Sequence, residues 1–147
     1  MRRSAAFAAG LLVLASCGGA GDPRKDVATT VQDFQAAAVD GNGDAYCDLL
    51  SGKGKEEALR GFAAIGGEFD CPKGLEKARG LLGKDEIDDL DEARKQTGPE
   101  DVTVRGDRAR VTLPGGKQMR LIRSDGDWLI NSIPKMPREK DRKRSRG

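Results

Sequence analysis

The pattern of apolar and polar positions changes its period once along the chain. Up to about residue 82, apolar side chains recur every three or four positions, as on one face of a helix. From residue 102 onward they alternate with polar side chains, as in a half-buried strand. The first pattern predicts helices over residues 23–40, 45–51, 53–65 and 72–82. The second predicts strands over residues 102–105, 109–113, 118–123 and 128–133.

Start and stop signals support the predicted helices. Asp22 is suited to cap the first helix, Pro23 to occupy its first position, and Gly41 to end it. Asp44 is expected to cap the second helix. The apolar residues expected to face inward are Val27, Val31, Phe34 and Ala38 in the first helix, Leu59, Phe62 and Ala63 in the third, and Leu75, Ala78 and Leu82 in the fourth.

The connectors "GD", "PGG" and "DGD" are typical of tight hairpins, because Gly and Asp tolerate positive φ. They predict an antiparallel meander, with Trp128 in its core rather than on an exposed binding surface. The side chains expected to line its buried face are Val102, Val104, Ala109, Val111, Leu113, Met119, Leu121, Trp128 and Ile130. Helices followed by a meander predict an α+β fold, in which the N-terminal helices pack on a curved, cone-like four-stranded antiparallel sheet over residues 23–134.

The N-terminus has the parts of an export signal. Arg2 and Arg3 precede an uncharged apolar stretch, residues 5–15, which is too short for a stable membrane-spanning helix. Its end, "LASC" (14–17), resembles the lipobox of bacterial lipoproteins. The resemblance implies that residues 1–16 are removed and that the thiol of Cys17 receives a diacylglycerol, with residues 17–22 as a tether. An ordinary secretory signal with an incidental cysteine is the alternative.

The charge is unevenly distributed. Without Arg2 and Arg3, 24 Lys and Arg face 24 Asp and Glu. The last 13 residues, 135–147, hold seven basic and two acidic groups, so the preceding domain is acidic. This balance argues against nucleic acid as the main partner. The tail is interpreted either as a disordered, solubilising end or as a segment that contacts anionic lipid or wall polymers.

If Cys17 is acylated, Cys47 and Cys71 are the remaining cysteines, and an exported chain can oxidise them to a disulfide. Such a bond would tie the second helix to the start of the fourth. A redox pair or a metal site is the alternative. Their separation of 24 positions and the absence of histidine disfavour zinc, and no CxxC motif is present.

The order of these features resembles small actinobacterial lipoproteins of the nuclear transport factor 2-like superfamily. The resemblance rests on the lipobox, the stretch "VATTVQDFQAAAVDGNGDAYCDLLS" with its paired cysteine, and the hairpin "GDWLINSI". It implies a cone-shaped α+β fold and an envelope location. It implies no single activity, because such folds host enzymes, binding domains and oligomerisation modules.

Candidate chemistry is sparse. A ketosteroid-isomerase-type enzyme would use Tyr46 as a hydrogen-bond donor and a carboxylate such as Asp44 as base inside the cone. The alternative is that Tyr46 packs at the helical rim and Asp44 caps its helix. The segment 40–51 fails the calcium-loop pattern at its sixth and twelfth positions, Ala45 and Ser51. The acidic segment 84–92 is expected to form a solvated face, with Ile87 and Leu90 inward, rather than a cation site.

These observations predict a non-enzymatic accessory or binding lipoprotein, lipid-anchored through Cys17 on the outer face of the bacterial cytoplasmic membrane. It would offer its domain to a small apolar ligand or to an envelope protein. No cofactor and no metal site are expected. The small enzyme that uses Tyr46 is the alternative function, and dimerisation through the open sheet face is a third possibility.

Overall fold

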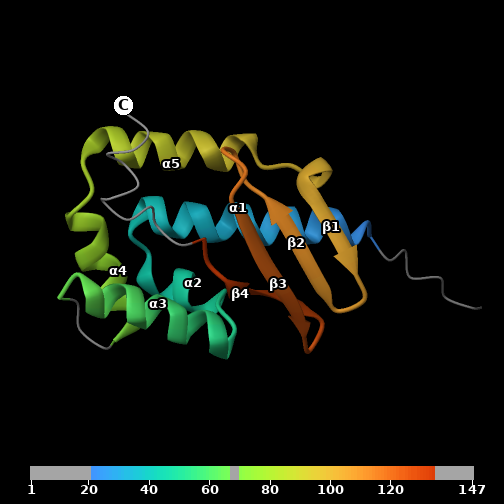
Figure 1. Cartoon of the computed structure of the whole chain (residues 1–147), viewed down its shortest axis with the longest axis horizontal. Helices are drawn as coiled ribbons and strands as arrows, with labels where there is room; N and C mark the ends of the chain where they lie inside the picture. The colour runs from blue at the N-terminus through green and yellow to red at the C-terminus, as the bar shows by residue number, and fades with distance from the viewer. Residues whose placement is uncertain (1–20, 67–69, 135–147) are drawn as a thin grey trace, which may run out of the picture.

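The computed structural model describes residues 21–66 and 70–134, in which helices pack against one antiparallel sheet (Figure 1). The α+β fold class predicted from the sequence is confirmed, and the sheet is open rather than closed into a barrel. The helices are α1 (Pro23–Asp40), α2 (Gly43–Asp48), α3 (Gly52–Ala64), α4 (Cys71–Gly80), α5 (Lys84–Gln96) and the 3₁₀ turn η1 (Pro99–Asp101). The strands are β1 (Val102–Arg105), β2 (Arg108–Thr112), β3 (Gln118–Ser124) and β4 (Asp127–Ser132).

Helix α1 has the predicted ends. The side chain of Asp22 accepts a hydrogen bond from the backbone N–H of Arg24, and Gly41 takes the left-handed conformation with φ 72°. The predicted cap of α2 is wrong. Asn42, not Asp44, accepts the N–H of Ala45, because the helix begins at Gly43 and Asp44 therefore lies exposed in its first turn.

Helix α3 buries a slightly different stripe from the one expected. Gly54, Ala58 and Phe62 face the core, whereas Ala63 is exposed. The cause is the close approach of the first turn of α3 to β4. A Cβ at Gly54 would lie only 2.3 Å from the carbonyl oxygen of Ile130, so the stripe is set by the position of this glycine.

The acidic segment forms helix α5, and none of its residues is buried. Ile87 is half-buried, but Leu90 is 38% exposed, so the expectation that it faces inward is wrong. The physical reason is the place of α5 in the fold. It packs mainly along α1 (Figure 1), and none of its side chains is buried. At its end, Gln32 of α1 donates a hydrogen bond to the carbonyl oxygen of Thr97.

The four strands form the predicted meander in the order β1-β2-β3-β4. Asp125 and Gly126 both have positive φ, 52° and 91°, which is the geometry of a two-residue hairpin loop. An isolated bridge from Leu50 to Ile130 pairs the outer edge of β4 with the α2–α3 junction. One face of the sheet is packed beneath the helices, and its buried residues are Val102, Ala109, Val111, Met119, Leu121, Trp128 and Ile130.

Candidate functional site

The predicted disulfide is present. Cys47 of α2 and Cys71 at the start of α4 are bonded, with their Cα atoms 6.2 Å apart. A Cβ at Gly43 would lie 2.6 Å from the Cα of Pro72, so the two helix starts approach closely beside the bond. The disulfide therefore clamps two neighbouring helices.

Tyr46 and Asp44 do not come together. Tyr46 is buried between two phenylalanines, stacked on Phe34 with ring centroids 4.4 Å apart and tilted against Phe62 at 6.4 Å. Burial raises the pKa of Tyr46 to about 12. Asp44 is exposed, and residues two apart on a helix do not face each other. The space between the helices and the sheet is occupied by one continuous cluster of buried side chains.

Several predicted features lie outside the described residues. These are the signal segment 1–16, the lipidation site Cys17, most of the tether 17–22 and the basic tail 135–147. Within residues 21–66 and 70–134, no helix combines the length and the apolar character needed to cross a membrane.

The face of the sheet that points away from the helices is strongly basic. Because side chains alternate along a strand, the residues between the buried positions of β1, β2 and β3 all project to this side. Four of them are exposed arginines, here called the sheet-face arginines: Arg105, Arg108, Arg110 and Arg120.

The strand register arranges these side chains in two rows across the sheet. In one row, Arg110 of β2 lies opposite Arg120 of β3, flanked by Thr103 of β1 and Ser132 of β4. The second row contains Arg105, Arg108, Ile122 and Leu129. Each row therefore places two arginines side by side.

The sheet-face arginines differ from every other arginine that the structure describes. Arg24 pairs with Asp22, the N-cap of its helix, and Arg60 and Arg94 pair with carboxylates on their own helices. Arg79 donates to the carbonyl oxygen of Val39, and Arg123 donates to that of Gly126 and lies over the ring of Trp128. Within residues 21–66 and 70–134, no hydrogen bond or ion pair involves the guanidinium group of a sheet-face arginine.

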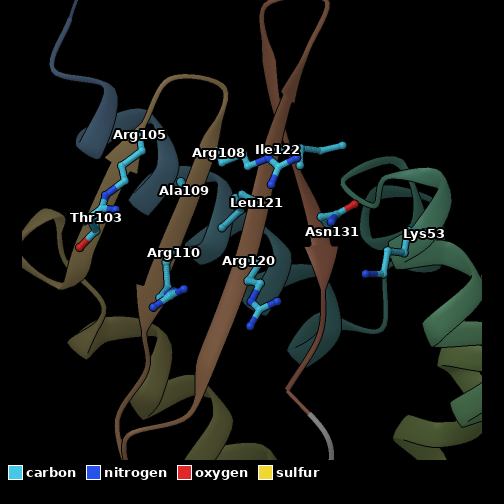
Figure 2. Close-up of a pocket in the computed structure, with 10 residues that line it drawn as sticks. All are labelled: Lys53, Thr103, Arg105, Arg108, Ala109, Arg110, Arg120, Leu121, Ile122 and Asn131. Carbon is cyan, nitrogen blue, oxygen red and sulfur yellow. The ribbon is translucent and has the colours of Figure 1, made fainter.

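A shallow groove of about 730 Å³ runs over this face (Figure 2). Its basic walls are the four sheet-face arginines and Lys53 of α3, and no carboxylate lines it. In Figure 2, Arg110 and Arg120 project side by side from neighbouring strands, and Lys53 and Asn131 stand at the opposite margin. The oxygen of Asn131 accepts a hydrogen bond from the hydroxyl of Ser51, so its amide N–H groups are the polar atoms left for a ligand. The groove thus offers donors and positive charge, as an anion requires.

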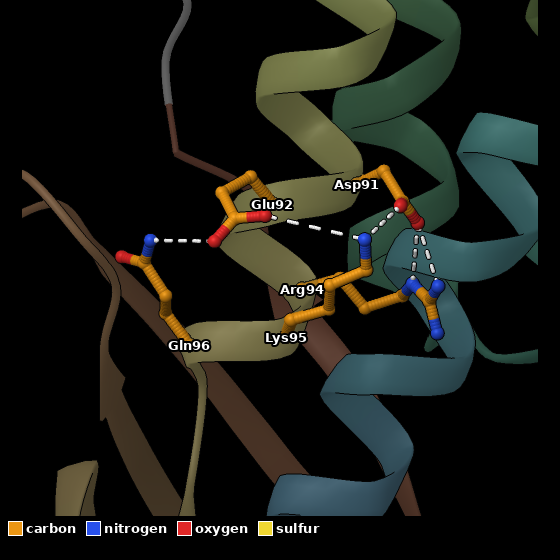
Figure 3. A network of polar contacts seen from close by, with 5 residues as sticks. All are labelled: Asp91, Glu92, Arg94, Lys95 and Gln96. Carbon is orange, nitrogen blue, oxygen red and sulfur yellow. Dashed lines mark hydrogen bonds and ion pairs between the residues drawn. The ribbon is translucent and has the colours of Figure 1, made fainter.

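A cluster of acidic residues lies on α5, where basic neighbours partly neutralise Asp91 and Glu92 (Figure 3). Arg94 and Lys95 both contact Asp91, at 2.6 and 2.8 Å. Hydrogen bonds from Lys95 and then Arg94 hold the pKa of Asp91 below its usual value. In the described part of the chain, no three His, Cys, Asp or Glu side chains converge as they would around a metal ion.

No relative is found for this chain. It matches no protein-family model, no curated protein and no solved structure. The resemblance to the nuclear transport factor 2-like lipoproteins therefore stays a prediction.

The basic face could have been noticed in the sequence. Arginine alternates with apolar residues in "RARV" and "MRLIR", which predicts one charged and one apolar side for each strand. The apolar side of each strand predicted the core. The net charge of the whole domain is acidic and conceals the basic side of the strands.

Proposed function

We propose that this chain is a lipid-anchored, extracytoplasmic binding protein that presents the open face of its sheet to an anionic partner in the cell envelope. The lipobox-like "LASC" supports the anchor and the compartment. The Cys47–Cys71 disulfide agrees with export, since such bonds persist mainly in oxidising compartments. The function is thus one of binding at a membrane surface.

The observation that carries the binding role is the set of four unpaired guanidinium groups on one face. A folded domain gains nothing from placing Arg110 opposite Arg120, because like charges directly across a sheet destabilise it by about 0.2–1 kcal/mol. An anion bound between the two arginines attracts both, and this attraction offsets their mutual repulsion. The lining of the groove holds five basic side chains and no carboxylate, which favours an anionic ligand over the small apolar ligand expected from the sequence.

Metabolic labelling tests the anchor. The full chain is expressed in a bacterial host with labelled palmitate, beside a Cys17→Ser variant. We expect label and membrane fractionation for the wild type and neither for the variant. A chain that is exported without incorporating label would overturn the anchor. Free thiols at Cys47 and Cys71 in the unreduced protein would overturn the oxidising compartment.

A further inference from the structure

We propose that the open face of the sheet docks on the anionic phospholipid headgroups of the membrane to which the chain is anchored, with Arg110 and Arg120 binding lipid phosphate between them. This inference rests on the proposed function, because the lipid on Cys17 is what brings the membrane within reach.

The Arg110–Arg120 pair has the geometry of a phosphate clamp. Directly opposed residues of an antiparallel sheet have Cβ atoms about 4.5–5.5 Å apart. The guanidinium groups of Arg110 and Arg120 are therefore close enough to bind the same phosphate. Guanidinium forks bind phosphate oxygens in a bidentate manner. The hydroxyl group of Thr103 flanks the pair on the β1 side, and Asn131 of β4 also lines the groove, so both add hydrogen-bonding capacity.

The second row explains why a lipid surface fits better than free phosphate. Ile122 and Leu129 lie opposite each other on this face, beside Arg108. Both are half-buried, and neither belongs to the hydrophobic cluster or packs against it. Basic side chains next to aliphatic ones suit the boundary between headgroups and acyl chains. A soluble anion would leave the aliphatic pair in water.

The tether begins at the β1 edge of the sheet. Helix α1 contacts β1, and Figures 1 and 2 both show the N-terminal end of α1 beside that strand, with Arg105 close to it. The stretch from Cys17 to Pro23 is six residues, which span at most about 20 Å when extended. The anchor therefore keeps the β1 edge, where Arg105 lies, within reach of the headgroups at high effective concentration.

A second copy of the chain is a weaker candidate for this face. Two sheets packed face to face by a twofold axis would bring the same arginines against each other. The acidic helix α5 of another copy offers the opposite charge, but Arg94 and Lys95 already neutralise part of it. The phosphate groups of a membrane are not neutralised by basic side chains of the protein in this way.

The test uses vesicle co-sedimentation of the full chain carrying Cys17→Ser, so that no acyl anchor contributes. Vesicles of phosphatidylglycerol and phosphatidylcholine (30:70) are compared with phosphatidylcholine alone and with inorganic phosphate as a competitor. The variant Arg110→Gln/Arg120→Gln is compared with Arg60→Gln, which removes an exposed arginine of α3 that does not line the groove. All of these proteins share the same N-terminal segment and basic tail, so the contribution of these segments cancels.

We expect stronger binding to the anionic vesicles, a loss of about 30-fold in the double variant, and no change for Arg60→Gln. The factor follows from about 1 kcal/mol per basic group at an anionic surface. Millimolar phosphate should compete weakly, and strong competition by it would identify a soluble anion as the ligand and overturn the proposal.

Equal affinity of the double variant and the wild type would show that the tail alone binds, and would overturn the proposal. Self-association in sedimentation velocity that is lost in the double variant would assign the face to a second copy instead. These outcomes are independent of palmitate labelling. A chain that is acylated but binds vesicles without its sheet-face arginines refutes this inference and leaves the proposed function standing.

Discussion

On the open face of the sheet, Arg110 of β2 is the direct cross-strand partner of Arg120 of β3. The two positive charges repel in the unliganded protein, and no carboxylate among the described residues pairs with either. The pair therefore lowers the stability of the free protein, whereas it favours the binding of an anion.

Replacing Arg110 by Gln should stabilise the free protein. We expect the free energy of unfolding in urea to rise by about 0.5 kcal/mol at low salt, because a like-charge pair is removed. At 1 M salt the difference should shrink, because screening already weakens the repulsion in the wild type. Arg60→Gln is the control, since it removes an exposed helical ion pair and should change stability little or lower it. A loss of stability in Arg110→Gln at low salt would contradict the prediction.

Replacing Gly54 by Ala should destabilise the fold. The new Cβ would meet the carbonyl oxygen of Ile130 at 2.3 Å, so α3 must move away from β4. We expect a loss of about 1–3 kcal/mol in urea unfolding, the usual cost of overpacking. Gly61→Ala on the same helix is the matched control. It has no neighbour within 4 Å and should gain about 0.5–1 kcal/mol from the lower entropy of the unfolded chain. Equal effects of the two substitutions would refute the close approach.

Removing the disulfide should cost about 3 kcal/mol, because Cys47 and Cys71 are separated by 24 positions and close a loop of moderate length in the unfolded chain. Urea unfolding of the double variant Cys47→Ala/Cys71→Ala measures this loss. Reductant should lower the free energy of unfolding of the wild type toward that of the variant, and it should not change the value for the variant. If reductant does not affect the wild type, the bond is either absent or energetically silent.

The ionisation of Tyr46 should lower stability at high pH. Burial raises the pKa of Tyr46 to about 12, whereas the unfolded chain ionises near pH 10. Below pH 10 both states hold the proton and the group contributes no pH dependence. Between pH 10 and 12 the folded state holds more protons, so the free energy of unfolding falls as the pH rises, by up to about 1.4 kcal/mol per pH unit.

Tyr46 is the only tyrosine in the chain, so its ultraviolet absorbance reports this titration directly. We expect no tyrosinate absorbance from the folded protein at pH 10.5. Tyr46→Phe should lose this part of the pH dependence of unfolding, while the lysines titrate in both proteins. Ionisation at pH 10 in the folded state would show that the hydroxyl is open to water.

Local patterns predicted most of the elements. The spacing of Val27, Val31 and Phe34 placed α1, and the positive-φ pair Asp125–Gly126 placed the β3–β4 hairpin, because each depends on neighbours in the chain. The wrong cap of α2 was a local error, whereas two other failures came from contacts between distant segments. Gly54 faces inward because β4 approaches α3 closely, and Leu90 stays exposed because α5 packs mainly along α1.

The candidate site also depends partly on local sequence pattern and partly on tertiary contacts. The sequence by itself determined which side chains share one side of each strand, since alternation is a property of the extended backbone. Only the tertiary structure decided that helices cover the apolar side, that strand register sets Arg110 against Arg120, and that no carboxylate lines the groove around them. The reason is that strand pairing and side-chain burial depend on which distant segments pack together. The charge of a surface depends on the same packing, because it determines which side chains remain exposed there.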